Sequence, residues 1–170
     1  MRRKSLCELE CPIARSLDLV GEAWTLLILR DALLGATRFQ DFQERLGMPP
    51  STLSRRLEQL TEQGLLERSV YEEKPVRERY QLTEKGADLA PVLLALSAWG
   101  NRWLAPDGPP LECVDPETGV LVEPVVVDRR TKRELSAGRV ALRAGGGASR
   151  ELKRKLPTQV LFGRASEVAP

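Results

Sequence analysis

One predicted helix near the middle of the chain, residues 50–63, carries short polar groups and arginines on one side. These side chains are Ser51, Thr52, Arg55, Arg56 and Gln59, and Leu53, Leu57 and Leu60 recur at helical spacing on the other side. Hydroxyl groups near a helix N-terminus can bind phosphate, and an arginine can bind phosphate or donate two hydrogen bonds to guanine. The pattern indicates a helix that contacts duplex DNA, with either arginine able to be the base contact.

A second basic group lies in a predicted β-hairpin at residues 65–82, whose loop is Glu72–Pro75. It consists of Lys74, Arg77 and Arg79, and Arg77 has the reach and permanent charge to enter a minor groove or bind the flanking backbone. Arg38, at the start of a short predicted helix, is a further candidate. An isolated arginine pair or basic hairpin is more often a solvated surface. Here both groups occupy positions that face DNA when a helix-turn-helix is followed by a hairpin.

The composition argues against catalysis and against a metal site. The 170 residues contain no histidine and three cysteines, Cys7, Cys11 and Cys113. This removes the usual general base, the histidine-activated nucleophiles and a four-thiolate zinc site. Scattered acids such as Glu112 and Asp115 have no recognisable catalytic partner. We therefore expect no enzyme activity and no cofactor.

The elements that must position the basic groups follow from apolar spacing and turn residues. Helices are predicted over 12–34 with a break at Gly21, over 38–46, over 50–63, and from Thr83 to about Leu104 with a bend or an adjusted start at Pro91. Gly47 and Pro50 favour a tight turn between the two middle helices. The fold class is mainly α with a β-hairpin wing (winged helix-turn-helix), plus a small β-rich C-terminal appendage.

The composition changes at Ala105, where proline and glycine mark a linker. The predicted organisation is a DNA-binding and dimerisation domain at 1–104, a linker at 105–110, a β-rich appendage at 111–146 and a flexible basic tail at 147–170. Short strands are expected at 111–114, 119–127 and 139–143, and no internal repeat is evident. The tail residues Arg150, Lys153, Arg154 and Lys155 could add non-specific DNA affinity, although such a run is more often only solvated.

Several short motifs resemble the HxlR family of winged-helix regulators, relatives of the MarR type. They are Cys11-Pro12-Ile13, the run from Gly21 to Arg30, Arg38-Phe39, the leucines of the 50–63 helix closing on Gly64-Leu65-Leu66, the stretch Tyr80 to Gly86, and Trp99. The resemblance covers residues 7–104 and implies a homodimer on a pseudo-palindromic operator, commonly acting as a repressor. It also implies that Ser51, Thr52, Arg55 and Arg56 lie on the recognition helix and Arg77 in the wing.

Apolar side chains at both ends of the predicted domain favour dimerisation. More apolar surface is present than a domain of this size is expected to bury, and it belongs to Leu93, Leu96, Trp99 and Trp103. A partner surface is offered by Ile13 and Leu17. A two-fold dimer would place two recognition helices about 34 Å apart, one turn of DNA. The alternative is that the two tryptophans cover the domain's own core.

Cys11 is a candidate redox sensor, since the resemblance extends to regulators thought to respond to oxidants or electrophiles through a cysteine at this position. A thiolate beside a helix N-terminus and near Arg15 would be more reactive. The alternative is a small packed residue. A small-molecule ligand could also release the protein from DNA.

The charge balance leaves a second function class open. Net charge is +2, and residues 1–104 hold 15 basic and 15 acidic side chains. A winged-helix module that binds proteins rather than DNA is therefore the alternative. No apolar run is long enough to cross a bilayer and no signal peptide is evident, so a cytoplasmic location is expected.

Overall fold

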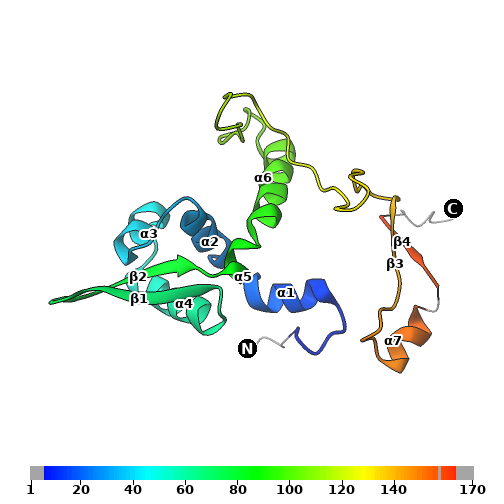
Figure 1. Cartoon of the computed structure of the whole chain (residues 1–170), viewed down its shortest axis with the longest axis horizontal. Helices are drawn as coiled ribbons and strands as arrows, with labels where there is room; N and C mark the ends of the chain where they lie inside the picture. The colour runs from blue at the N-terminus through cyan, green and yellow to red at the C-terminus, as the bar shows by residue number, and fades with distance from the viewer. Residues whose placement is uncertain (1–5, 157, 164–170) are drawn as a thin grey trace. The chain divides into compact units, whose positions relative to one another are not determined.

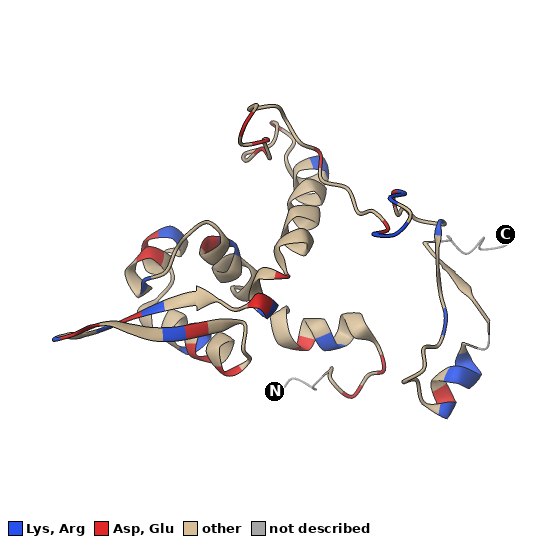
Figure 2. Ribbon diagram, viewed as in Figure 1, with Lys and Arg blue, Asp and Glu red and all other residues tan. Residues whose placement is uncertain are grey.

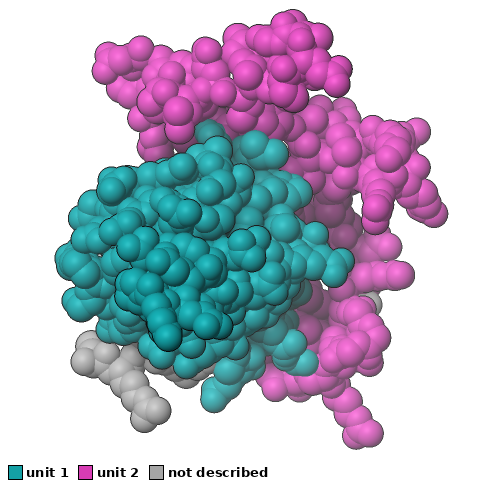
Figure 3. Space-filling model, turned by 60° about the vertical axis from the view of Figure 1, so that its left-hand side comes forward, with its two compact units in different colours: residues 1–97 teal, residues 98–170 magenta. Residues whose placement is uncertain are grey.

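The structure is a computed structural model that describes residues 6–156 and 158–163. The chain divides into two compact units, residues 1–97 and 98–170, which are coloured separately in Figure 3 and described here one at a time. Helix α6 (Ala90–Leu104) begins in the first unit and ends in the second. The basic groups of the predicted helix and hairpin all belong to the first unit.

The first unit is a winged helix-turn-helix (Figure 1). Its elements are α1 (Pro12–Val20), α2 (Thr25–Leu33), α3 (Phe39–Leu46), α4 (Pro50–Glu62), β1 (Leu66–Glu73), β2 (Val76–Leu82) and α5 (Glu84–Ala87). The core is formed by apolar side chains from α2, α3, α4 and the start of the hairpin, among them Ile28, Phe42, Leu53 and Leu66. The leucine side of α4 is therefore buried as the spacing predicts.

The break predicted at Gly21 in the first helix is confirmed. α1 ends at Val20 and α2 begins at Thr25. A Cβ atom on Gly21 would stand 2.4 Å from the carbonyl oxygen of Leu17, so a side chain would not fit here without movement of the backbone. Gly21 thus allows the chain to turn tightly between α1 and α2.

The helix predicted from Thr83 to Leu104 forms as two helices. Thr83 caps the four-residue α5, its hydroxyl accepting from the Gly86 amide at 3.1 Å, and α6 starts at Ala90. Pro91 therefore falls in the first turn of α6, where its missing N–H costs no helical hydrogen bond. Of the two outcomes expected at Pro91, a bend or an adjusted start, the structure has an adjusted start, at Ala90.

The second unit differs from the expectation in three ways. The strands predicted at 111–114 and 119–127 are absent, and isolated bridges join Val114 to Leu121 and Val127 to Glu134 instead. The expected flexible tail instead contains α7 (Arg150–Lys155) and β4 (Val160–Phe162). β4 pairs antiparallel with β3 (Val140–Leu142), so the appendage extends to residue 163. The predictions that concern residues 1–5, 157 and 164–170 lie outside the described residues.

The second unit also contains a repeated turn that apolar spacing does not reveal. Asp115 Oδ1 accepts from the amides of Glu117 (3.0 Å) and Thr118 (2.8 Å), and Asp128 Oδ1 accepts from those of Arg130 and Thr131, both at 2.7 Å. The backbone N–H groups lower the pKa of both carboxyls. Two Asp-x-x-Thr turns thus recur thirteen residues apart, contrary to the expectation of no repeat.

Candidate nucleic-acid interface

The exposed side of α4 carries the short polar groups and one arginine. Gly47 ends α3 in the left-handed conformation (φ 60°) and Pro50 occupies the first turn of α4, so the two helices form a helix-turn-helix. Ser51, Ser54 and Arg55 are exposed, and Thr52 is half-buried. Their place opposite the buried Leu53, Leu57 and Leu60 is the arrangement that a DNA-recognition helix needs.

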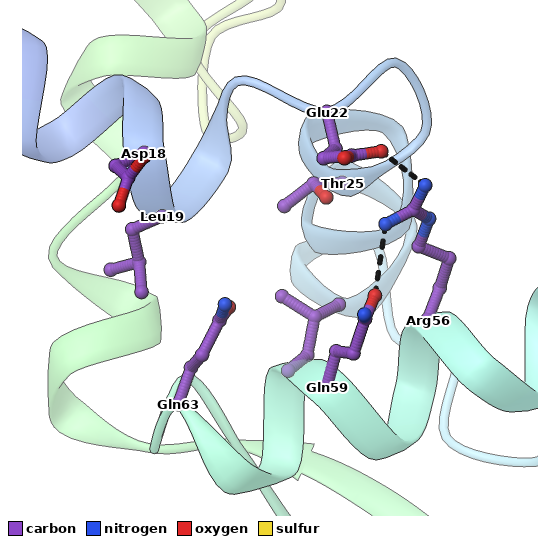
Figure 4. A pocket seen from close by; sticks show the side chains of 8 residues that line it. Asp18, Leu19, Glu22, Thr25, Arg56, Gln59 and Gln63 are labelled. Carbon is purple, nitrogen blue, oxygen red and sulfur yellow. Dashed lines mark hydrogen bonds and ion pairs between the residues drawn. The ribbon is translucent and has the colours of Figure 1, made fainter. Parts of the chain in front are cut away.

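Arg56 and Gln59 do not share this exposed side. The Arg56 side chain is only 14% exposed and is ion-paired with Glu22 at the α1–α2 turn. Its second terminal nitrogen donates to Gln59 Oε1 at 2.9 Å, and the three side chains meet in a cavity of about 170 Å³ between α1, α2 and α4 (Figure 4). Helical periodicity places Arg56 beside the leucine side of α4, where a long side chain can turn inward. In the structure the Arg56 side chain does turn inward.

The hairpin presents its basic residues among acidic ones. Lys74, Arg77 and Arg79 are all exposed. Arg77 lies 3.4 Å from a Glu72 carboxylate oxygen, and Arg79 Nε donates to Ser69 Oγ at 3.0 Å. Figure 2 shows blue and red residues alternating along the hairpin. Such exposed pairs are weak and can exchange for phosphate contacts at little cost.

Arg38 lies at the junction of α3 and the hairpin. Its guanidinium stacks 5.1 Å above the centroid of the Tyr71 ring, and its backbone forms a bridge with Arg79. The adjoining Tyr80 amide donates to the Thr37 carbonyl at 2.7 Å. The Asp41 carboxylate accepts from the amides of Arg38 and Thr37, which lowers its pKa. The start of α3 is therefore fixed against the wing.

A groove of about 660 Å³ runs between the helices and the wing. It is lined by Arg38, Phe39, Gln40, Ser54, Tyr71, Val76, Arg77, Glu78 and Tyr80. Burial of the Tyr80 phenol raises its pKa, so the phenol stays protonated at neutral pH. The candidates predicted from the sequence do not include Ser54, Gln40 and Tyr71. Ser54 could have been found from its spacing of three from Ser51, whereas Tyr71 carries only the signal of a strand-forming residue.

The residues predicted at a dimer interface fall into two groups. Ile13 and Leu17 on α1, and Leu96, Trp99 and Trp103 on α6, are exposed, with the tryptophans 54% and 64% accessible. Leu93 differs, since it is half-buried against the core of the first unit. The exposed members stay candidates for contact with a partner.

The remaining candidates lie on other parts of the surface. Cys11 is exposed at the N-cap of α1, and Arg15 Nε donates to the Leu9 carbonyl at 3.3 Å. Arg150, Lys153 and Arg154 are on α7, where Lys155 pairs with Glu151 at 2.6 Å.

Within residues 6–156 and 158–163, no group of three or more acidic or cysteine side chains could hold a metal ion. In the same residues no helix is long and apolar enough to cross a membrane.

Comparisons with known proteins agree with this geometry. Residues 19–108 match the model of the HxlR-like helix-turn-helix family. An uncharacterized HTH-type transcriptional regulator of Mycobacterium tuberculosis is 40% identical over 141 residues, covering 82% of this chain and 89% of the relative. The structure of PA1374, a proposed transcription factor from Pseudomonas aeruginosa, is 42% identical with a TM-score of 0.63, covering 86% of this chain and 100% of that one. Reduced HypR, a redox regulator, is 30% identical with a TM-score of 0.52, covering 55% of this chain and 96% of that one.

Proposed function

Because the chain belongs to the HxlR-like helix-turn-helix family of transcriptional regulators, we propose that it binds a pseudo-palindromic operator as a homodimer and represses transcription. The observation that carries the proposal is the groove between α4 and the wing. One wall supplies Ser54 and leads to Ser51 and Arg55, and the other supplies Arg77. In this proposal α4 enters the major groove and the hairpin follows the flanking backbone.

Each contacting residue has a distinct role in the proposal. Ser51 and Thr52 bind phosphate near the start of α4, and Arg55 donates to a base edge. The phosphate backbone is bound by the exposed basic residues of the wing, Lys74, Arg77 and Arg79. It is also bound by Arg38, which lines the groove beside the wing. Arg56 and Gln59 hold α4 against the α1–α2 turn and do not contact DNA.

Binding to a fragment from the gene's own upstream region tests the proposal across a salt series. Affinity should fall log-linearly with salt, because each phosphate contact releases counterions. Arg55→Ala should lose discrimination between operator and random DNA, whereas Arg77→Ala should weaken both about equally. Arg45→Ala on α3 is the matched control and should change neither.

The same titration separates this function from the alternative of a protein-binding module. That alternative draws support from the 15 basic and 15 acidic residues of positions 1–104. Absence of binding to any duplex at low ionic strength would favour it and contradict DNA regulation.

Oxidants are proposed to release the protein from DNA through Cys11. The support is the exposed thiol at the start of α1, together with the name of HypR as a redox regulator. Oxidation or a disulfide between subunits would move α1 and, through the Glu22–Arg56 ion pair, α4. Diamide should abolish operator binding by wild type and leave that of Cys11→Ser intact. Equal release of both would contradict the proposal, and Cys113→Ser is the matched control.

A further inference from the structure

The charges of the second unit are divided along the chain. Residues 98–128 contain one basic and six acidic side chains, whereas residues 129–163 contain ten basic and two acidic ones. In Figure 2 the blue residues of this unit gather on α7 and on the segment that precedes β3. Positions 1–104 are evenly balanced, so the largest excess of positive charge in the chain lies outside the winged helix-turn-helix.

Four of these basic side chains lie on a single turn, which we call the basic turn and which consists of Arg129, Arg130, Lys132 and Arg133. All four side chains are exposed. Asp128 shapes the turn, because its carboxylate accepts from the amides of Arg130 and Thr131, both at 2.7 Å. Its carbonyl accepts from the Lys132 amide, and its own amide donates to the Arg133 carbonyl, both at 2.8 Å. The four cations therefore project from a hydrogen-bonded backbone rather than from an irregular loop.

The same backbone occurs thirteen residues earlier without the positive charge. There the Gly119 amide donates to the Asp115 carbonyl at 2.8 Å, and Gly119 has a φ of 69°. Lys132 occupies the equivalent position with a φ of 58°, a left-handed conformation that is less favourable for lysine than for glycine. The basic turn thus carries a cation where the backbone favours glycine, which indicates a function for the side chain.

The cations of the basic turn are not neutralised by neighbouring acids. The Asp128 carboxylate is occupied by two backbone amides, and within the described residues none of the four basic side chains forms an ion pair. The wing and α7 differ, since Arg77 pairs with Glu72 and Lys155 pairs with Glu151. The charges of the basic turn are therefore available to an external anion.

We propose that the basic turn binds the phosphate backbone of duplex DNA outside the operator. The inference rests on the proposed operator binding and adds to it a contact that needs no particular base sequence, since phosphates occur at every step of the duplex. An arginine can bind one phosphate through two parallel hydrogen bonds, so four cations within five residues can contact more than one phosphate.

The sequence around the basic turn favours duplex DNA over other polyanions. No aromatic residue lies between Trp103 and Phe162, whereas proteins that bind single strands stack the bases on aromatic rings. Binding to an anionic lipid surface relies on an amphipathic helix with large apolar side chains, and the basic turn belongs to no helix. Contact with the phosphates of a duplex requires only exposed cations.

The test uses the full chain and two duplexes, one limited to the operator and one extended on each side by about 20 base pairs of random sequence, two helical turns. Wild type should bind the long duplex more tightly than the short one. Arg129→Gln with Arg130→Gln should leave affinity for the short duplex unchanged and lower that for the long duplex about tenfold, with a shallower salt dependence, because phosphate contacts are lost. An unchanged affinity for the long duplex would overturn the inference.

Two control variants separate a local contact from an effect of total charge. Arg150→Gln with Arg154→Gln removes the same charge from exposed positions of α7 and should leave both affinities close to those of wild type. Adding Glu112→Gln and Glu117→Gln to the variant of the basic turn restores the net charge and should leave binding to the long duplex weak. An equal loss in the α7 variant, or recovery through the two glutamate changes, would show that affinity follows total charge and would contradict the inference.

A measurement on the wild type covers the case in which the variant of the basic turn fails to fold. Acetylation of lysines is followed by mass spectrometry with each duplex. Lys132 should be protected by the long duplex and not by the short one, Lys74 of the wing by both, and Lys153 of α7 by neither. Lys132 that reacts equally with and without the long duplex would overturn the inference, as would protection that only vesicles containing phosphatidylserine provide.

Failure of this inference is distinguishable from failure of the proposed function. A wild type that binds both duplexes equally, with Lys74 protected and Lys132 reactive, contradicts only the contact by the basic turn. A wild type that ignores both duplexes contradicts DNA regulation as well.

Discussion

Arg55 and Arg56 are neighbours in α4 whose guanidinium groups have opposite surroundings. Arg55 is exposed beside Ser51 and Ser54, whereas Arg56 is largely buried and paired with Glu22 and Gln59. Helical periodicity alone left both on the polar side, because a long side chain between the polar and leucine faces can turn either way. Arg56 turns inward because it pairs with Glu22, which is 34 residues away in the sequence. The spacing of residues in the sequence does not reveal this contact.

This difference predicts separate effects of the two substitutions. Arg56→Ala should lower the free energy of unfolding by about 1–2 kcal/mol, since it removes a half-buried ion pair and the packed stem of the side chain. Arg55→Ala should leave stability within about 0.5 kcal/mol of wild type while weakening operator binding. Urea denaturation and DNA titration of both variants measure the effects. Equal stability of the two would contradict an internal role for Arg56.

The stacked pair of Arg38 and Tyr71 predicts a graded series. Tyr71→Phe keeps the aromatic face, so operator affinity should stay within twofold of wild type. Tyr71→Leu removes it and should weaken binding about threefold to fivefold, since exposed cation–π contacts contribute about 0.5–1 kcal/mol. Arg38→Ala should in addition reduce the salt slope by about one. A Tyr71→Phe variant as weak as Tyr71→Leu would indicate that the hydroxyl, and not the ring, matters.

At the scale of elements, turn chemistry explains most differences between expectation and structure. Apolar periodicity located the helices of the first unit and the hairpin, because each buries one face in a shared core. The second unit lacks such a core in its described residues, and valine runs there favour a strand that the paired turns interrupt. The Asp-x-x-Thr hydrogen bonds at Asp115 and Asp128 shape this region, and periodicity is insensitive to them.

The start of α3 predicts a pH-dependent contribution to stability. Amides of Thr37 and Arg38 donate to the Asp41 carboxylate, so its pKa in the folded state lies below the usual value for an aspartate. Stability from this carboxylate is present above the unfolded pKa and is lost as pH falls through the folded value. Asp41→Asn should therefore lower Tm at pH 7, and the difference from wild type should shrink as the pH falls below about 4, the usual pKa of an aspartate. Glu44→Gln, on the exposed side of α3, is the control and should show no comparable pH dependence. A difference that is constant with pH would contradict the role of the charge.

At the scale of the whole molecule, DNA affinity and dimerisation should be linked. A single winged helix-turn-helix presents one α4 and one hairpin, whereas a two-fold dimer presents two to successive turns of a duplex. Phosphate contacts determine the salt dependence of binding, so its slope reports how many copies of the interface engage DNA. The first unit is proposed to supply the DNA contacts, and the exposed residues of α6 are proposed to supply the pairing.

Leu96→Glu tests this linkage on the exposed side of α6. A charge in the proposed interface should produce monomers at low micromolar concentration, and the slope of log affinity against log salt should fall to about half because half as many phosphates are contacted. Ser97→Glu adds the same charge at the next exposed position and serves as the control. If Leu96→Glu stayed dimeric with the wild-type slope, α6 would not be the interface. If it became monomeric while the slope stayed unchanged, each protomer would engage DNA alone and the palindromic operator would lose its physical basis.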